Sequence, residues 1–272
     1  MSVIMKKVNL HILEHCNFHC AGCFAHFDSK KAKDYDFWKQ VLDNLKYSGL
    51  VDAINFAGGE PLIHKHFSKL VEYAKQLNFK VSVVTNGYFI NEKWLDNNAQ
   101  NLDCIGIYMD SLNDKITIQL GRCTNKNEIF NLQKLQKVCE YIYAKNLDTK
   151  IKLNTVVSRL NYNEKFTDKI KNLDISRWKI MKLKVFDNGK FNNRDLSINN
   201  EQFNYFLENN PHKNAVAESS MVNSYLMVDA NGNLVDNASD NYKTIGNVYA
   251  EKFETLYKKY NTFNHNLYAE RY

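Results

Sequence analysis

The feature that most constrains the fold is a regular alternation of short apolar segments with helical ones. The apolar segments lie at 8–13, 53–59, 80–87, 104–111, 149–158 and 177–186, and the helical ones at 37–49, 66–78, 91–101, 126–146 and 164–173. Strands joined by helices of that length form right-handed βαβ units in a parallel sheet. We therefore predict an α/β fold, a partial (β/α)6 barrel rather than a complete eightfold one.

The last third of the chain has a different pattern. Asn199 and Gln202 are spaced as a helix N-cap pair. Residues 224–237 (SYLMVDANGNLVDN) read as a hairpin that turns at Asn231 and Gly232. We expect residues 1–190 to form the barrel core. Residues 191–272 would form a C-terminal extension that covers the substrate site within one continuous structural unit.

Composition excludes several classes of protein. The 272 residues include only two prolines and ten glycines, which argues against a disordered or linker-rich chain. Apolar runs are too short for a membrane helix, and MSVIMKKVNL lacks the features of a signal peptide. We therefore expect a cytoplasmic protein with reduced cysteines. The net charge is +6 without a basic block, which favours a phosphorylated small molecule over nucleic acid.

Three cysteines, Cys16, Cys20 and Cys23, lie in one loop after the first strand, and the next cysteine is Cys104. A disulfide would leave one of the three unpaired. Structural zinc would need a fourth ligand, such as a histidine of the same loop. Three thiolates suit a four-iron cluster whose remaining iron is open to a small ligand. This pattern favours the cluster, with zinc and unligated thiols as the alternatives.

The C-x3-C-x2-C spacing after a first strand resembles that of the radical S-adenosylmethionine (SAM) enzymes. The resemblance implies that the three cysteines hold a [4Fe-4S] cluster and that SAM chelates its open iron. Reduction then cleaves SAM to a 5′-deoxyadenosyl radical. One departure is Gly22, because the residue before the third cysteine is usually aromatic in this superfamily.

A second segment, Gly58-Gly59-Glu60, matches the GGE signature of the superfamily. Glycines allow close backbone approach, so we expect this segment to meet SAM, with Glu60 and backbone groups receiving its ammonium. An ordinary strand-to-helix turn is the alternative. The resemblance also implies SAM contacts after the third and fourth strands and in the LGR segment, from Asn86, Asp110, Ser111 and Arg122.

The resemblance narrows to viperin-like enzymes. The segments NFHC, INFAGGEP, VVTNG, KLNTVVSRLN, RWKI and ESSMVNSYL occur in the order found in that family. It implies conversion of a nucleoside triphosphate, CTP or UTP before GTP, to the 3′-deoxy-3′,4′-didehydro analogue, for antiviral (anti-phage) defence. It also implies an external electron donor of flavodoxin or ferredoxin type. We expect a monomer with no nucleic-acid or membrane partner.

The triphosphate needs cations, and two strands offer them. Lys152 and Asn154 share one face of the fifth strand, and Arg177 and Lys179 share one face of the sixth. We predict an anion clamp from these four residues, which in the family hold phosphates and ribose. Solvated positions on an edge strand are the alternative. We assign Lys182 and Lys184 to that solvated class.

Two further residues have roles that only the resemblance implies. Tyr225 matches a tyrosine near the ribose to which the family's proton or hydrogen transfer is ascribed, and a hairpin tyrosine with ordinary packing is the alternative. Glu218 resembles a residue beside the base. Ala53 and Ala57 stand where the family has a lysine and a serine, and Asn237 stands where it has a cysteine. We expect the Asn237 amide at the base edge.

Two other functions stay open. No cysteine follows Cys139, so the auxiliary clusters of peptide-modifying radical SAM enzymes cannot be built. A queuosine-pathway or activase-type enzyme remains within the superfamily. A non-catalytic metal-binding module that recognises nucleic acid remains from another class.

Overall fold

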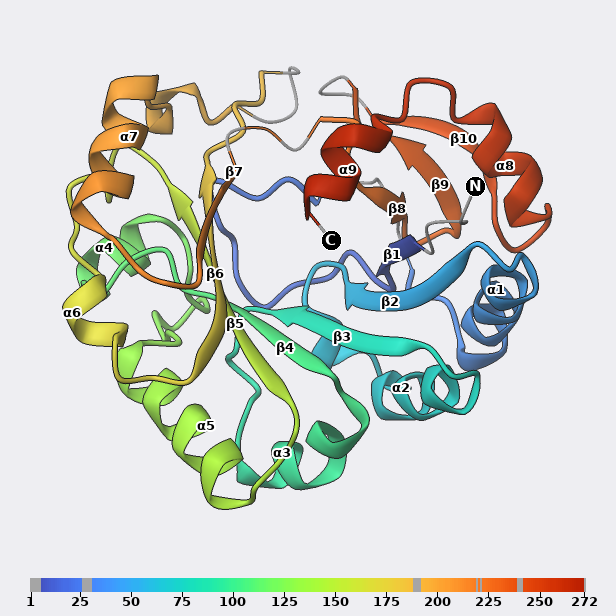
Figure 1. Ribbon diagram of the computed structural model, residues 1–272, viewed down its shortest axis with the longest axis horizontal. Coiled ribbons are helices and arrows are strands. Elements are labelled where there is room, and N and C mark those ends of the chain that lie inside the picture. Colours follow the sequence, from blue (N-terminus) through green and yellow to red (C-terminus); the bar gives the residue numbers. More distant parts are fainter. Residues whose placement is uncertain are drawn as a thin grey trace.

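The protein is an open, curved sheet wrapped by helices (Figure 1). Its computed structural model describes residues 6–25, 31–187, 192–218, 220, 222–238 and 242–271. Within these residues the strand order is β10-β9-β8-β1-β2-β3-β4-β5-β6-β7. The sheet stays open between β7 and β10, which are its two ends, so the predicted partial barrel is confirmed.

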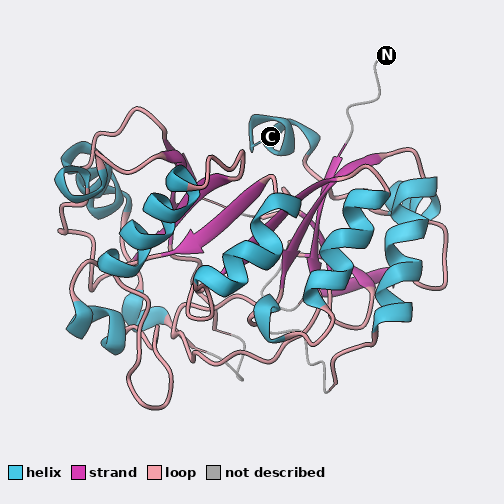
Figure 2. Ribbon diagram, turned by 90° about the horizontal axis from the view of Figure 1, so that it is seen from below, coloured by secondary structure: helices cyan, strands magenta, loops and turns pink. Residues whose placement is uncertain are grey.

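The core consists of parallel strands in sequence order. They are β1 (Lys6–His11), β2 (Val51–Ala57), β3 (Lys80–Thr85), β4 (Cys104–Tyr108), β5 (Lys150–Val157) and β6 (Ile175–Lys182). The helices between them are α1 (Tyr35–Tyr47), α2 (Phe67–Gln76), α3 (Glu92–Asn98), α4 (Asp114–Gln119), α5 (Leu132–Ala144) and α6 (Thr167–Ile170), and the short 3-10 turns are η1 (Pro61–Ile63) and η2 (Ala99–Asn101). Figure 2 shows helices lying across the outer face of the sheet.

Two of the predicted helices are shorter than expected. The segment predicted as a helix over 126–146 is helical only from Leu132, because Asn131 caps that helix and Asn127 adopts a left-handed conformation with φ 59°. The helix predicted over 164–173 is limited to α6. The Asn210 side chain accepts a hydrogen bond from the Phe166 backbone amide and donates one to the Glu164 carbonyl, in place of helical hydrogen bonds. Helix α4, the strands over 215–218 and 243–247, and the helices over 253–259 and 265–271 were not predicted.

The extension supplies strands to both edges of the core. Strand β7 (Ala215–Glu218) pairs with β6, and β8 (Leu226–Val228) pairs with β1, both in parallel. Strands β9 (Asn233–Asp236) and β10 (Lys243–Asn247) continue the sheet in antiparallel pairs. The predicted hairpin turn is present, since the Gly232 amide donates to the Asp229 carbonyl over 2.9 Å and Gly232 has φ 84°.

The remaining elements are η3 (Arg194–Leu196), α7 (Asn200–Asn209), α8 (Phe253–Lys259) and α9 (His265–Arg271). Helix α7 begins with the predicted capping box, in which Asn199 and Gln202 bond reciprocally. In the view of Figure 1, helix α9 lies in the hollow that the curved sheet encloses. Over the residues described, no helix combines the length and apolar character needed to cross a membrane.

The two faces of the sheet differ in chemistry, because successive side chains of a strand point to opposite faces. On β1, Val8 and Leu10 are fully buried in the apolar core, whereas Lys7, Asn9 and His11 line an interior cavity. Strand β5 repeats the pattern, with Ile151 and Leu153 in the core. The apolar face therefore binds the helices, and the polar face is left for a ligand.

Candidate active site

The cysteine loop is held between two glycine-containing segments. On one side, the Gly59 and Glu60 amides donate to the Leu13 and His15 carbonyls over 2.8 and 2.9 Å. On the other side, the His19 and Ala21 amides of the loop donate to the Gly121 and Leu120 carbonyls over 3.2 and 3.0 Å. These backbone contacts fix the loop at the carboxyl ends of the strands, where α/β barrels place their chemistry.

The glycines of the GGE segment have a different role from the one expected. A Cβ atom on Gly59 would lie 2.2 Å from the His15 carbonyl oxygen, and one on Gly58 would lie 2.3 Å from the Leu13 carbonyl oxygen. Gly58 also has φ 148°, which side chains rarely allow. The close approach that requires glycine in this structure is therefore to the chain leading into the cysteine loop. An approach of the same segment to SAM stays a prediction.

The three thiols line one cavity of about 120 Å³, named here the thiol cavity. Burial raises the pKa of Cys16 to about 11 and that of Cys20 to about 12, and it also raises the pKa of Cys23. Metal binding favours the thiolate form, so such buried thiols suit a metal cluster that compensates their charge. Among the described residues, no group of three or more His, Cys, Asp or Glu side chains is placed to hold a single metal ion.

Most of the predicted SAM residues share this cavity. Its lining includes Gly58, Gly59, Asn86, Asp110 and Arg122. The Asn86 side chain donates to the Asn17 side-chain oxygen over 2.8 Å and approaches the Cys16 sulfur at 3.8 Å. Residues that follow the ends of β2, β3 and β4 therefore meet around the cysteine loop.

Glu60 and Ser111 do not line the thiol cavity, contrary to expectation. Glu60 is fully buried and accepts hydrogen bonds from the Thr85 hydroxyl over 2.7 Å and the Asn86 amide over 2.8 Å. Burial raises the Glu60 pKa to about 7, although these hydrogen bonds oppose the shift. The Ser111 hydroxyl donates to Glu164 over 2.5 Å. The polar atoms of both side chains therefore form hydrogen bonds within the protein, and these bonds hold neighbouring segments of the site together.

Arg122 and Asp110 form a buried ion pair at the edge of the thiol cavity. Burial alone would lower the Arg122 pKa, but the Asp110 carboxylate raises it above its ordinary value. The second Asp110 oxygen accepts from the Val156 amide over 2.8 Å. The guanidinium also lies 4.8 Å from the centre of the Tyr108 ring. The pair thus fixes a permanent cation beside the cysteine loop.

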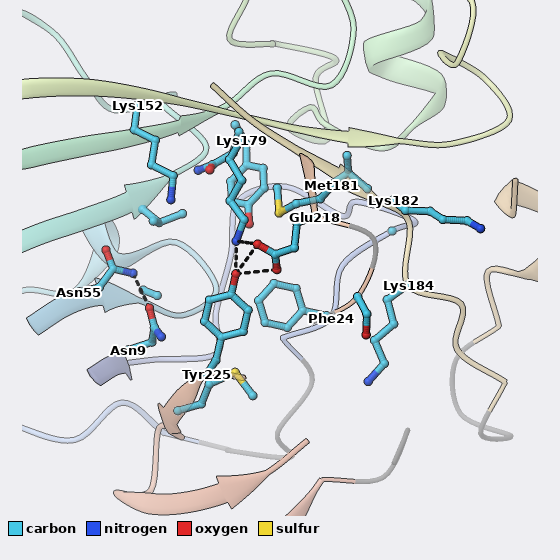
Figure 3. A pocket seen from close by; sticks show the side chains of 18 of the residues that line it. Asn9, Phe24, Asn55, Lys152, Lys179, Met181, Lys182, Lys184, Glu218 and Tyr225 are labelled. Atoms are coloured by element: carbon cyan, nitrogen blue, oxygen red, sulfur yellow. Dashed lines mark hydrogen bonds and ion pairs between the residues drawn. The ribbon is translucent and has the colours of Figure 1, made fainter. Parts of the chain in front are cut away.

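A second cavity of about 200 Å³, the clamp cavity, lies in the barrel interior (Figure 3). It contains every predicted substrate residue, namely Lys152, Asn154, Arg177, Lys179, Glu218 and Tyr225. Among the described residues that line it, six carry a cationic side chain (Lys7, Lys152, Arg177, Lys179, Lys182 and Lys184) and one, Glu218, carries a carboxylate. Such an excess of positive charge suits a polyanion.

The two cavities share a wall. Residues that line both are His11, Gly22, Phe24, Ala57, Val84, Tyr108 and Val156. His11, Ala57 and Tyr108 each end a core strand. Burial lowers the His11 pKa to about 4, which keeps its imidazole neutral. A molecule in the clamp cavity therefore lies next to whatever the thiol cavity holds, and none of the described residues shared by the two cavities places a charge between them.

The pKa of Lys152 shows that bringing these cations together disfavours their charged forms. Its pKa is lowered to about 7, chiefly by burial and then by repulsion from Lys179, Lys7 and Arg177, while Cys104 opposes the shift. In Figure 3 the Lys152 and Lys179 side chains both extend into the cavity. An anionic ligand would remove this penalty, because it favours the charged form of lysine.

Lys179, Glu218 and Tyr225 form a connected cluster in the clamp cavity (Figure 3). The Lys179 ammonium contacts both partners, and the Tyr225 hydroxyl lies 2.6 and 2.7 Å from the two Glu218 oxygens. The ammonium lies 4.6 Å from the centre of the Tyr225 ring. Glu218, expected beside the base, is thus bonded to a residue expected to hold phosphate.

Several cavity residues were not predicted. Lys7 and Asn9 alternate on β1, and Asn55 on β2 donates to Asn9 over 2.9 Å (Figure 3). The alternation of Lys7, Asn9 and His11 in the first strand was a signal that could have found them. Lys182 and Lys184 line the cavity despite our assignment to a solvated class. The Lys182 ammonium donates to Asn200 over 2.8 Å and points away from the centre.

Asn237 does not lie where the sequence analysis predicted it, at the edge of the base. Its side chain is fully buried and accepts a hydrogen bond from the Asn223 amide over 2.7 Å. It does not line the clamp cavity; it follows the end of β9, and β8 lies between β9 and the core strand β1 in the sheet. Our expectation of a base contact from Asn237 was therefore wrong. Ser219 and Met221 of the ESSMVNSYL segment lie outside the described residues.

Comparison with known proteins first defines the class. Residues 10–169 match the family model of the Radical SAM superfamily, which is more than half of the chain. Among solved structures, Streptococcus suis SuiB bound to S-adenosylmethionine is similar with a TM-score of 0.72 and 14% identity, over 99% of this chain and 68% of that chain. anSMEcpe with bound AdoMet and Kp18Cys peptide gives a TM-score of 0.72 and 18% identity, over 96% and 83%. At such identities these two structures show the fold alone.

Curated relatives define the family. An S-adenosylmethionine-dependent nucleotide dehydratase of Selenomonas ruminantium is 42% identical over 98% of each chain. One of Flammeovirga pacifica is 31% identical over 88% of this chain and 85% of its own. The chain belongs to the S-adenosylmethionine-dependent nucleotide dehydratases of the radical SAM superfamily. It is an enzyme that uses a [4Fe-4S] cluster and SAM, and Cys16, Cys20 and Cys23 fit the cysteine motif of that superfamily.

Proposed function

We propose that this dehydratase acts on a nucleoside triphosphate in the clamp cavity and forms its 3′-deoxy-3′,4′-didehydro analogue. The observation that carries the proposal is the shared wall. A cavity with an excess of cations adjoins the cavity of the three thiols, and His11, Ala57 and Tyr108 border both. A substrate with its phosphates among the lysines can then place its ribose at this wall.

In the thiol cavity, we assign Cys16, Cys20 and Cys23 to the cluster, and Gly58, Gly59, Asn86, Asp110 and Arg122 to the surroundings of SAM. When bound, the cluster and SAM supply a 5′-deoxyadenosyl radical that can take a hydrogen atom from an unactivated carbon. Phe18, Phe24 and Leu183 line the same cavity and exclude water from it. Exclusion of water protects a reactive species from side reactions.

In the clamp cavity, we assign Lys152, Arg177 and Lys179 to the phosphates and Asn154 to the ribose. Lys152 pairs in register with Arg177, and Asn154 pairs with Lys179, so the four side chains come from one face of two adjacent strands. Arginine can bind a phosphate through two parallel hydrogen bonds, whereas lysine acts as a point charge. The clamp therefore fixes the triphosphate, and with it the position of C4′.

The cluster of Lys179, Glu218 and Tyr225 is suited to moving a proton. Loss of the C4′ hydrogen leaves a carbon radical, and loss of the 3′ hydroxyl as water needs one proton and one electron. The Tyr225 hydroxyl donates to Glu218 and accepts from the Lys179 ammonium, so a proton that it gives up can be replaced from Lys179. We propose Tyr225 as the proton or hydrogen donor.

Electrons come from outside the chain in this proposal. One electron starts SAM cleavage and a second completes the double bond, and we propose a flavodoxin or ferredoxin as the donor.

We also propose that the enzyme acts as a monomer. Residues 1–190 would form the barrel core and residues 191–272 the cover of the substrate site, because β7 and β8 join opposite edges of the core and bring Glu218 and the chain beside Tyr225 to the cavity.

For the base, we propose CTP or UTP before GTP. The resemblance of the second half of the chain to viperin-like enzymes supports the pyrimidines, which are also the smaller bases. With Asn237 buried elsewhere, the candidates for the base edge are Ser220 and Val222, which line the cavity beyond Glu218. We further propose that the product serves anti-phage defence, where it would terminate the chains that a viral polymerase extends.

The test is an anaerobic reaction of the reconstituted enzyme with all four ribonucleoside triphosphates in competition, followed by mass spectrometry. We expect a didehydro product from a pyrimidine triphosphate. With substrate deuterated at C4′, the label should appear in 5′-deoxyadenosine, whereas label at C3′ or C5′ should not. If no triphosphate stimulates SAM cleavage, the proposed substrate class is wrong. A product from GTP alone would overturn only the base preference.

A further inference from the structure

Lys7 lies on the first strand, away from the two strands that form the predicted clamp. It alternates with Asn9 and His11 on one face of β1, and all three side chains line the clamp cavity. Its register partner on β2 is Ala53, whose side chain is small. The Lys7 side chain therefore projects into the interior without a bulky neighbour on that strand.

Lys7 also belongs to the group of cations at the start of the strands. Burial lowers its pKa, Arg177 lowers it further, and Cys104, Asp103 and Asp52 oppose the shift. Lys7 and Arg177 in turn lower the pKa of Lys152. Three mutually repelling cations in one partly buried region favour the binding of an anionic ligand there.

The backbone of Lys7 is fixed by the C-terminal helix. The Lys7 amide donates to the Tyr268 hydroxyl over 2.5 Å, and that hydroxyl donates to the Lys7 carbonyl over 3.1 Å. Tyr268 lies on α9, is 3% exposed, and packs against Phe263 with ring centres 5.3 Å apart. Since the hydroxyl serves both backbone groups, Tyr268 sets where the β1 strand starts and where the Lys7 side chain leaves it.

The position of Lys7 along the strand indicates which part of the substrate it meets. His11 borders the thiol cavity, and Lys7 lies four residues before it, roughly 13 Å along a strand. A ribose at the shared wall and three phosphates in line can span that distance. The first phosphates then lie nearer to Lys179 and Lys152, and the terminal one lies nearest to Lys7.

We propose that Lys7 is a further substrate-binding residue that contacts the terminal phosphate, and that Tyr268 is the residue that positions it. This inference rests on the proposed triphosphate substrate and deepens it. It makes the first strand and the C-terminal helix part of the discrimination between nucleoside triphosphates and diphosphates. Neither Lys7 nor Tyr268 was predicted to have a role in the site.

The test is calorimetric binding of a pyrimidine nucleoside triphosphate and the matching diphosphate to the reconstituted holoenzyme with SAM. For Lys7→Met, we expect triphosphate affinity to fall by about tenfold to a hundredfold, the effect of losing one charge-assisted contact. Diphosphate affinity should change little, so the ratio between the two ligands collapses. Lys7→Arg should keep most of the ratio. Lys150→Met, an exposed lysine at the start of β5, is the matched control and should behave like wild type.

Tyr268→Phe keeps the ring and removes the hydroxyl, so we expect a smaller loss of the same ratio at unchanged diphosphate affinity. If Tyr268 had only a structural role, Tyr268→Phe would lower the affinity for both ligands equally, and that result would overturn the positioning role. The inference on Lys7 fails if Lys7→Met binds the triphosphate as tightly as the wild type does. It also fails if Lys7→Met weakens the binding of both ligands equally and Lys7→Arg has the same effect. If wild-type enzyme binds no triphosphate while it still cleaves SAM, the proposed function itself fails.

Discussion

Gly59 and His15 lie so close that a Cβ atom on Gly59 would come within 2.2 Å of the His15 carbonyl oxygen. His15 directly precedes Cys16, so this contact fixes the start of the loop that carries the three thiols. The Glu60 amide, next along the chain, bonds the same carbonyl over 2.9 Å. The GGE segment and the cysteine motif are therefore two parts of one packed unit.

Gly59→Ala should displace the cysteine loop, because the new methyl group would meet backbone atoms, which cannot rotate away. We expect most of the bound iron to be lost after reconstitution and unfolding to become easier by about 1–3 kcal/mol. Iron analysis, the absorption spectrum and urea unfolding would measure this. Gly49→Ala is the control, because Gly49 has φ 65° but open space around its Cβ position, so it tests backbone strain without the contact. Equal iron content in both variants would contradict the prediction.

Cys20→Ala should abolish SAM cleavage and leave the fold largely intact, because the loop lies outside the apolar core that holds the sheet and helices together. Cys139→Ala offers the opposite case. Cys139 is 7% exposed within that core on α5, so its loss should lower stability by about 1 kcal/mol and leave iron content unchanged. Iron content, 5′-deoxyadenosine formation and thermal unfolding of the two variants separate the roles. Normal 5′-deoxyadenosine formation by Cys20→Ala would refute the cluster assignment.

The ion pair of Lys179 and Glu218 should behave as a coupled unit in stability measurements. Both side chains are 10% exposed, so Lys179→Met leaves a buried carboxylate without its ammonium and should cost about 3 kcal/mol. Adding Glu218→Gln removes that carboxylate charge and should restore part of the loss. A double-mutant cycle by urea unfolding measures the coupling. Additive effects of the two substitutions would mean that the pair contributes no coupling.

Triphosphate affinity should fall as the pH rises above 7, because of Lys152. Its pKa is about 7 in the free protein, chiefly because of burial and then repulsion from Lys179, Lys7 and Arg177, with Cys104 opposing. A bound polyanion raises this pKa, so above pH 7 binding requires the uptake of a proton. The affinity should weaken by up to about tenfold per pH unit between pH 7 and 9. Lys152→Arg, which stays charged, should flatten the dependence, and equal slopes for both proteins would exclude Lys152 as its source.

The same shift predicts a gain in stability for the ligand-free protein when Lys152 is replaced. A lysine whose pKa is lowered on folding opposes folding fully below about pH 7, and this effect fades as the pH rises toward the ordinary value of 10.5. Lys152→Met should therefore raise the unfolding temperature at pH 7 by several degrees, more than at pH 10. A lower unfolding temperature at both pH values would show that Lys152 stabilises the fold.

Local patterns determined much of this protein. Alternation of strands and helices specified a parallel barrel, because apolar strands joined by helices have few other ways to bury their surface. The spacing of Cys16, Cys20 and Cys23 was sufficient to indicate a cluster. Lys152 and Asn154, or Arg177 and Lys179, could be placed on common faces because side chains alternate along a strand with a period of two. Each of these inferences depends on residues close together in sequence.

Only the tertiary structure decided which distant residues meet. It placed Gly59 against His15, bonded Glu218 to Lys179, buried Asn237 and brought Tyr268 of the last helix to the backbone of Lys7. Such pairs depend on strand order, register and the packing of the C-terminal extension, and no local spacing encodes them. The sequence alone identified the chemistry of the first loop, whereas the shape and charge of the substrate cavity arose from strands that lie far apart in the chain.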